Sequence, residues 1–254
     1  MNVTPDSFSD GGQYADPAAA IAHGLQLVAD GAAIVDVGGE STRPQGARGV
    51  SAAEELERVL PVIRGLVRGG ATVSIDTTKA EVARAAVDAG AAIINDISGG
   101  HFDPGMIDLA AASGAFYVCG HVRGGTLAEV HAGDLGFEEV AYDLAARVAE
   151  LPIALRQRTI VDPGIGFGKR GAANLELLAR CGEIAAGCGR PVLVGPSRKR
   201  FLGELTGRPV DDRDAATVGA CLAAVAAGAH MVRVHDVRAL APALAAFTAV
   251  RGIA

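Results

Sequence analysis

Short apolar runs and alanine-rich stretches alternate along the whole chain. Each run is rich in Val and Ile, ends in a polar or glycine-rich cluster, and gives way to a stretch whose apolar residues recur at helical spacing. The runs lie at residues 33–37, 72–76, 92–96, 115–120, 158–162, 192–195 and 231–236. Near-continuous apolar strands that alternate with helices are typical of a parallel sheet covered on both faces. The pattern therefore predicts an α/β fold.

The spacing of these runs favours a barrel over an open, doubly wound sheet. The clearest helical stretches are residues 53–66, 80–89, 137–149, 175–185, 215–227 and 240–250. The strands recur about every 33 residues, which is typical of a TIM (β/α)8-type barrel. Counting back one unit puts the end of an eighth strand near residue 1, so residues 2–12 would form the loop that follows strand 1.

Most of strand 1 is thus absent from this sequence. An open barrel would leave two strand edges unpaired, and exposed edges of this kind are a liability. We therefore expect the missing strand to lie upstream of Met1.

Composition narrows the class of protein. Hydrophobic residues make up 50% of the 254 residues, and no linker divides them, so we predict a single domain over residues 1–254. The net charge of −6 argues against a general nucleic-acid binder. The four cysteines (Cys119, Cys181, Cys188 and Cys221) have no metal-binding spacing, and there is no signal peptide, which favours reduced thiols in the cytoplasm. The longest apolar run, around residues 220–227, is too short to span a membrane.

Polar residues concentrate at the ends of the predicted strands, where barrels of this type carry their active sites. Asp76, Asn95 and Asp162 offer acceptors for the N–H edges of a flat heterocycle. A cationic set suits phosphate: Arg43, Arg198, Lys199, Arg233 and His235. Oxygen ligands for Mg²⁺ are available at Asn2, Thr4, Asp6 and Ser7. These residues together predict a heterocyclic substrate that carries a diphosphate.

Two sequence features resemble other functional motifs but do not fit them. Residues 164–169 read GIGFGK, which has the wrong spacing for a Walker A loop, and Arg170 replaces its Ser or Thr. Cys119 beside His121 could suggest a thiol nucleophile, but a small buried barrel thiol is the better interpretation.

Seven segments of the chain, in this order, closely resemble the dihydropteroate synthases of folate biosynthesis. They are NVTPDSFSDGG (2–12), DVGGESTRP (36–44), SIDTTKAEVA (74–83), INDISGG (94–100), DPGIGFGK (162–169), GPSRKRFLG (195–203) and RVHDV (233–237). The resemblance implies a TIM barrel that condenses a dihydropterin methyl diphosphate with p-aminobenzoate, with Mg²⁺ as cofactor. It also implies a homodimer, and inhibition by sulfonamides as analogues of p-aminobenzoate.

The resemblance implies a role for each matching residue. The pterin would be held by Asp76, Asn95, Asp162 and Lys199, and the diphosphate by Arg233 and His235, with Asn2 on Mg²⁺. The p-aminobenzoate site would contain Thr42, Arg43, Pro44 and Ser197, with Phe8 from the first loop. The catalytic groups would be Asp76, Lys199, Arg233 and His235. Diphosphate would leave first, and Asp76 would stabilise the pterin methyl cation that the amine then attacks.

One position departs from the family pattern. The family usually has Met-His after strand 5, with the Met against the pterin, whereas this chain has Gly120-His121. Two other functions share the barrel and its acid and amide groups: a pterin-binding methyltransferase domain and a non-catalytic pterin-binding paralogue. The methyltransferase has no need of the SRK and RVH groups or the STRP loop, so their presence argues against it. The intact Asp76, Arg43, Lys199 and His235 argue against the non-catalytic paralogue.

Overall fold

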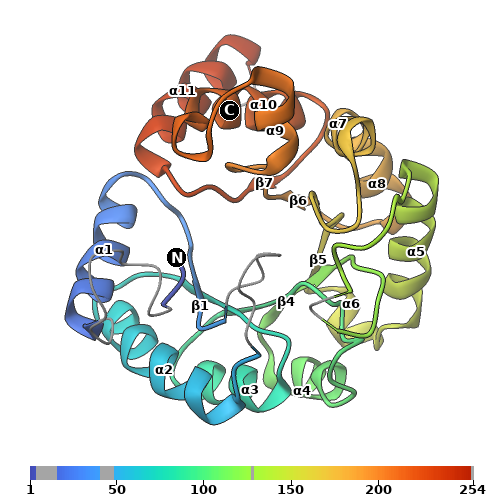
Figure 1. Ribbon diagram of the computed structural model, residues 1–254. Coiled ribbons are helices and arrows are strands. Elements are labelled where there is room, and N and C mark those ends of the chain that lie inside the picture. Colours follow the sequence, from blue (N-terminus) through green and yellow to red (C-terminus); the bar gives the residue numbers. More distant parts are fainter. Residues whose placement is uncertain (4–15, 41–48, 127–128, 253–254) are drawn as a thin grey trace.

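The computed structural model describes residues 1–3, 16–40, 49–126 and 129–252. Seven parallel strands lie around a central axis, with helices in a ring outside them (Figure 1). The strands are β1 (Val35–Gly38), β2 (Val73–Asp76), β3 (Ile93–Asp96), β4 (Phe116–Gly120), β5 (Thr159–Asp162), β6 (Leu193–Val194) and β7 (Met231–Val232). The predicted α/β barrel is thereby confirmed, and every predicted apolar run overlaps a strand.

The helices of the outer ring follow the strands in sequence. They are α1 (Pro17–Ala29), α2 (Ala52–Arg68), α3 (Ala80–Asp88), α4 (Met106–Ser113), α5 (Phe137–Glu150), α6 (Ile153–Arg156), α7 (Gly171–Ala179), α8 (Cys181–Cys188), α9 (Arg200–Thr206), α10 (Asp214–Ala226) and α11 (Val237–Arg251), with a short 3-10 helix, η2 (Val210–Asp212). The helix predicted over 175–185 is wrong as one element, because Arg180 leaves helical geometry at φ −121° and ψ 27° and separates α7 from α8. None of the helices in the described ranges is long and apolar enough to cross a membrane.

The sheet runs in sequence order around the barrel. Strands β1 to β5 form one sheet, β6 and β7 form another, and a bridge between Val161 and Val192 joins the two. Asn2 pairs in parallel with Gly38, so the residues at the start of this sequence lie beside β1, as predicted for the end of the first strand. Among the described residues, no backbone pairing joins β7 to Met1–Val3.

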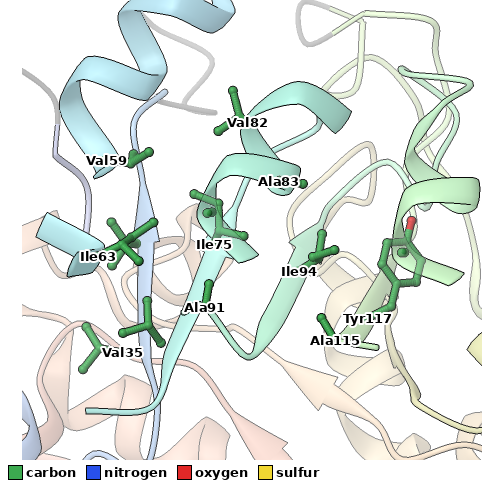
Figure 2. Close-up of a cluster of buried hydrophobic side chains, with 14 of the residues drawn as sticks. Val35, Val59, Ile63, Ile75, Val82, Ala83, Ala91, Ile94, Ala115 and Tyr117 are labelled. Carbon is green, nitrogen blue, oxygen red and sulfur yellow. The ribbon is translucent and has the colours of Figure 1, made fainter. Parts of the chain in front are cut away.

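The outer face of the sheet is the main hydrophobic core. Val59 and Ile63 from α2 meet Val35 and Ile75 from β1 and β2, and all four side chains are almost fully buried (Figure 2). The buried positions of α2 recur at helical spacing, and the helix starts at a capping box between Ser51 and Glu54. Each buried Val or Ile contributes about 1.5–3 kcal/mol, so this interface fixes the strand ends that carry the site.

A second apolar layer fills the inside of the barrel. Ile93, Val118, Ile160 and Leu193 are buried against one another, with Ile34 and Met231 packed on them. Because side chains alternate along a strand, the residues two positions further on also face inward, one level nearer the mouth. Those residues are Asp36, Asn95, Gly120, Asp162, Gly195 and Arg233. The barrel therefore sets a mostly polar layer directly above an apolar floor.

Candidate active site

Arg233 is the centre of the polar layer. Its Nε donates to Asp36 Oδ2 at 2.6 Å, and its Nη2 donates to Asp76 Oδ2 at 2.8 Å. Asn95 Nδ2 also donates to Asp36 Oδ2, at 3.1 Å. One guanidinium from the end of β7 thus ties together side chains from β1, β2 and β3. The structure brings three predicted site residues into one cluster, and it adds Asp36 to them.

The two carboxylates on Arg233 ionise differently. Burial opposes ionisation of Asp36, but Arg233 and hydrogen bonds outweigh it, so the pKa of Asp36 is lowered. Burial raises the pKa of Asp76 to about 7 against the opposing effect of Arg233, and the negative charge of Asp36 adds to the rise. Two acids that share one cation have pKa values that are pushed apart. Asp76 is therefore the group in this cluster that changes charge near neutral pH.

Asp162 and Lys199 lie on the other side of the mouth. Burial raises the pKa of Asp162, and the charges of Lys199 and Arg233 oppose that rise. Lys199 Nζ lies 4.4 Å from the centre of the Phe167 ring, a cation–π contact. A Cβ at Gly166 would lie 3.1 Å from Lys199 Cδ, so the lysine stem runs across this glycine. Asp162, Lys199 and Arg233 thus act on one another electrostatically.

The glycine loop after β5 shapes the wall beside Asp162. Gly164, Gly166 and Gly168 all have positive φ, which favours glycine. A Cβ at Gly164 would lie 2.1 Å from the carbonyl oxygen of His121, so only glycine allows this approach. Lys169 is buried and donates from Nζ to the His121 and Phe167 carbonyls, and burial lowers its pKa to about 7. Sequence reasoning missed this lysine as the anchor of the loop.

Ser197 and His235 meet above the polar layer. Ser197 Oγ lies 2.8 Å from the ring nitrogen Nδ1 of His235, and the backbone N–H of His235 donates to the same Ser197 Oγ at 3.2 Å. Strand β7 ends at Val232, earlier than the predicted run of 231–236, because its pairing with β6 covers only two residues. Arg233 and His235 consequently contact different partners, although both come from the same strand end.

Several predicted site residues lie outside the described residues. They are Thr42, Arg43, Pro44 and Phe8 of the p-aminobenzoate site, and Thr4, Asp6 and Ser7 among the proposed oxygen ligands. Asn2 is described, and its Oδ1 lies 3.7 Å from the point where a Cβ would stand on Gly38. Gly38 pairs with Asp76 in the sheet register, so Asn2 stands at the same rim of the barrel.

A partly buried ion-pair cluster of Lys79, Glu40 and Glu55 lies next to the site. Lys79 Nζ donates to Glu40 Oε2 and Glu55 Oε2, both at 2.6 Å, and Glu55 is completely buried. Burial would lower the pKa of Lys79, but the two glutamates raise it. The charge of Glu55 also contributes to the raised pKa of Asp76. The sequence pattern gave no signal for this cluster, because a glutamate within an amphipathic helix usually faces solvent.

Cys119 is a buried structural thiol, as expected from the sequence, and not a nucleophile paired with His121. Cys119 is fully buried, and burial raises the pKa of its thiol to about 12. His121 Nε2 lies 3.1 Å from Asp143 Oδ2, while burial and the charge of Lys169 lower its pKa to about 4. Transfer of the thiol proton to this imidazole is strongly unfavourable, because the pKa of Cys119 lies far above that of His121, so the two do not form an activated nucleophile pair. All four cysteines are free.

Gly120 allows a close backbone contact. A Cβ at this position would lie 2.5 Å from both Cα and O of Ile97, which belong to the turn after β3. Asp96 holds that turn by accepting from Ser98 N, Gly100 N and Tyr117 Oη at 2.7–2.9 Å. A side chain at residue 120, where the family usually has a methionine, would therefore meet backbone of the turn after β3.

Gly120→Ala is expected to lower the free energy of unfolding by about 1–3 kcal/mol, because the added methyl group displaces backbone. Urea unfolding measures this loss. Gly187→Ala in α8 is the matched control, since a Cβ there meets nothing within 4 Å, and it should be neutral or stabilising. A Gly120→Ala protein as stable as the wild type would show that the Ile97 turn yields freely.

The fold and this site define a barrel enzyme of a known class. The family model described as pterin binding enzyme matches residues 1–235. Dihydropteroate synthase from Mycobacterium leprae is 47% identical over 261 residues, covering 96% of this chain and 89% of the relative. The structure of Xanthomonas albilineans dihydropteroate synthase with 4-aminobenzoic acid superposes with a TM-score of 0.90 at 45% identity, over 98% of this chain and 90% of that one. A Yersinia pestis dihydropteroate synthase in complex with a sulfonamide drug also has a TM-score of 0.90, at 36% identity, over 99% of this chain and 92% of that one.

The chain therefore belongs to the pterin-binding enzyme family and, within it, to the dihydropteroate synthases.

Proposed function

We propose that this protein condenses a 7,8-dihydropterin-6-ylmethyl diphosphate with p-aminobenzoate, giving 7,8-dihydropteroate and diphosphate. The observation that carries the proposal is the polar layer. In it Arg233 donates hydrogen bonds to Asp36 and Asp76, and the charge of Lys199 opposes the raised pKa of Asp162. Acceptors for a heterocycle and cations for a diphosphate stand together over one apolar floor. The relative solved with 4-aminobenzoic acid supports the choice of the second substrate.

The residues divide between the two halves of the pterin substrate. Asp76, Asn95, Asp162 and Lys199 are proposed to hold the ring, with acceptors facing its N–H groups and Lys199 facing its carbonyl. Arg233 and His235 are proposed to bind the diphosphate. Ser197, hydrogen-bonded to His235, would line the p-aminobenzoate site together with Thr42, Arg43, Pro44 and Phe8.

The proposed chemistry is dissociative. Cations near the leaving group stabilise the charge that develops on diphosphate as the C–O bond breaks, and Asp76 in its ionised form stabilises the positive charge left on the pterin methyl group. The amine of p-aminobenzoate then attacks that carbon. Electrostatic stabilisation of this kind contributes about 3–4 kcal/mol for each well-placed group.

Magnesium fits the Asn2 position. The amide oxygen of Asn2 stands at the rim beside Gly38, and Mg²⁺ characteristically takes one or two protein oxygens and completes its shell with phosphate oxygens and water. Bound there, the ion would add positive charge to the leaving diphosphate. In the described ranges of the chain, no group of three or more His, Cys, Asp or Glu side chains could hold a metal.

Three further features belong to the same proposal. The chain would form one pterin-binding barrel domain over residues 1–254, supported by the family model that covers 1–235. It would work in the cytoplasm, where the four free thiols remain reduced. It would assemble as a homodimer, which sedimentation velocity can test.

Purified protein supplied with both substrates and Mg²⁺ is expected to form dihydropteroate and release an equal amount of diphosphate. His235→Ala should reduce turnover by about 10–100-fold through the loss of one charge-assisted contact. His23→Ala on the exposed face of α1 is the matched control and should keep full activity. Folded wild-type protein that makes no dihydropteroate would refute the proposed function.

A further inference from the structure

Arg198 has an unusual backbone conformation. Among the described residues it is the one non-glycine residue with positive φ, at 56°. This left-handed conformation costs about 1–2 kcal/mol for a residue with a Cβ. Strain of this size persists only where the surroundings enforce it, and it often accompanies function. Arg198 stands between Ser197 and Lys199, which are both proposed site residues.

Three residues at the start of α10 hold Arg198 in this conformation. Asp214 Oδ1 and Oδ2 accept from Arg198 Nε and Nη2, both at 2.8 Å, in a bidentate ion pair. The buried Thr217 accepts the Arg198 backbone N–H on its Oγ1 at 3.1 Å. Arg213 Nη1 donates to the carbonyl oxygens of Arg198 at 3.2 Å and Lys199 at 3.4 Å. The side chain and both peptide groups of Arg198 are thus fixed by one helix turn.

The packing of Arg213 ties this arrangement to α9. A Cβ at Gly203 would lie 2.2 Å from Arg213 Nη2, so the guanidinium rests directly on the glycine backbone. Helix α9 begins at Arg200, immediately after Lys199. Segment 197–199 is therefore held between the start of α9 and the start of α10.

The left-handed turn aims its two neighbours at different partners. Ser197 reaches His235 on the strand end of β7, while Lys199 reaches Phe167 on the glycine loop after β5. A right-handed or extended residue 198 would change the direction of the chain between them, so both contacts could not be kept. Two nitrogens of Arg198 donate to Asp214. Arg198 therefore differs from the proposed diphosphate-binding cations, with which sequence position alone groups it.

We propose that Asp214 is a positioning residue for the transfer reaction, acting through its bidentate pair with Arg198 to hold Ser197 and Lys199 in place. The proposal rests on the proposed roles of Ser197 and Lys199. Asp214 itself touches no substrate in this assignment. Its charge also lies close enough to His235 for that imidazole to contribute to the lowered pKa of Asp214, after the larger effect of Arg198.

Steady-state kinetics of Asp214→Ala, Arg198→Ala and Arg198→Gly test the proposal. Asp214→Ala is expected to raise KM for the pterin diphosphate and to lower kcat/KM by about 10–100-fold, the range of one lost charge-assisted pair. Arg198→Gly should keep several-fold more activity than Arg198→Ala, because glycine adopts φ 56° without strain. Asp212→Asn is the matched control, since Asp212 also pairs with an arginine but in solvent, and it should change nothing.

A double variant separates positioning from general support of the fold. If Asp214 acts through Arg198, Asp214→Ala added to Arg198→Gly should lower kcat/KM by less than about twofold, because the partner is already gone. A merely structural role would lower the active fraction, and hence apparent kcat, without changing KM. Unchanged KM in Asp214→Ala, or full additivity in the double variant, would overturn the proposal.

The same variants are measured by calorimetry with inorganic diphosphate, a readout that does not require turnover. Diphosphate reports on the positioning of Ser197 because Ser197 is hydrogen-bonded to His235, the proposed diphosphate ligand. Weaker diphosphate binding by Asp214→Ala than by Asp212→Asn supports the positioning role, and equal binding by the two contradicts it. A wild-type protein without turnover would refute the proposed function and leave this comparison intact. Should Asp214→Ala fail to fold by thermal melting, Asp214→Asn and Arg198→Gly carry the same comparison.

Discussion

Asp76→Asn is expected to lower kcat/KM for the pterin substrate by about 10²–10³-fold, the loss that follows removal of one preorganised electrostatic group. The amide has nearly the same shape as the carboxylate, so the change removes charge and leaves the packing. Asp76 accepts from Arg233 and stands at the level of Asn95 in the register of β2 and β3. The substitution therefore removes both a ring acceptor and the charge that stabilises the methyl cation.

The pH profile gives this prediction a second readout. Because the pKa of Asp76 is about 7, the carboxyl is protonated below that pH and cannot serve as an anion. The wild-type kcat/KM should fall by about tenfold per pH unit below 7 and level off above it. In Asp36→Asn the fall should begin at lower pH, since removal of the neighbouring negative charge lowers the pKa of Asp76.

Asp88→Asn, on an exposed position at the end of α3, is the matched control and should retain the wild-type profile. An Asp76→Asn enzyme that keeps more than a tenth of wild-type kcat/KM would contradict the role given to Asp76. So would an acidic limb that does not move in Asp36→Asn.

Arg233→Met is expected to have an equally large effect, lowering kcat/KM by about 10³-fold. The substitution leaves the mostly buried Asp36 and Asp76 without their shared cation. Because the Arg233 side chain is 40% exposed, the loss of stability should stay below the about 3–5 kcal/mol that breaking a fully buried pair costs. The pKa of Asp76 should then rise further, so that this carboxyl is protonated at neutral pH. Binding of the pterin ring and binding of the diphosphate should therefore both weaken.

His235→Ala is the comparison that isolates the diphosphate. His235 lies 2.8 Å from Ser197 Oγ and is assigned to the diphosphate, so its loss should weaken binding of the diphosphate and spare a pterin that lacks it. Calorimetry with both ligands makes the distinction, with Arg64→Met on the exposed face of α2 as the charge-matched control. Arg233→Met protein that binds the bare pterin as tightly as the wild type would refute the central role of Arg233.

The link between Arg233 and the pterin acids is a contact that sequence position does not predict. The RVHDV segment suggests one diphosphate-binding pair at the end of the last strand. In the structure, Arg233 is the cation on which Asp36 and Asp76 converge, although Arg233 and Asp36 are 197 residues apart. Only the curvature of the strands around the barrel axis brings the end of β7 near the end of β1, and a local sequence pattern cannot predict a contact between residues so far apart in the chain.

The sequence by itself determined the order of strands and helices and most of the side chains in the polar layer. The end of a strand is a local property, so the positions of Asp76, Asn95 and Asp162 at the mouth of the barrel follow from where each apolar run ends. Gly120 was visible as a departure, but its contact with the Ile97 backbone was not, because it depends on how closely β3 and β4 approach.

The tertiary structure alone decided the partners of the charged groups. Lys79 meets Glu55, Lys169 meets the His121 carbonyl, and Asp214 meets Arg198. In sequence each of these charges could equally belong on a solvated surface. Burial makes an unpaired charge costly, so the fold must bring a partner to each one, and the partner depends on which elements the barrel places side by side.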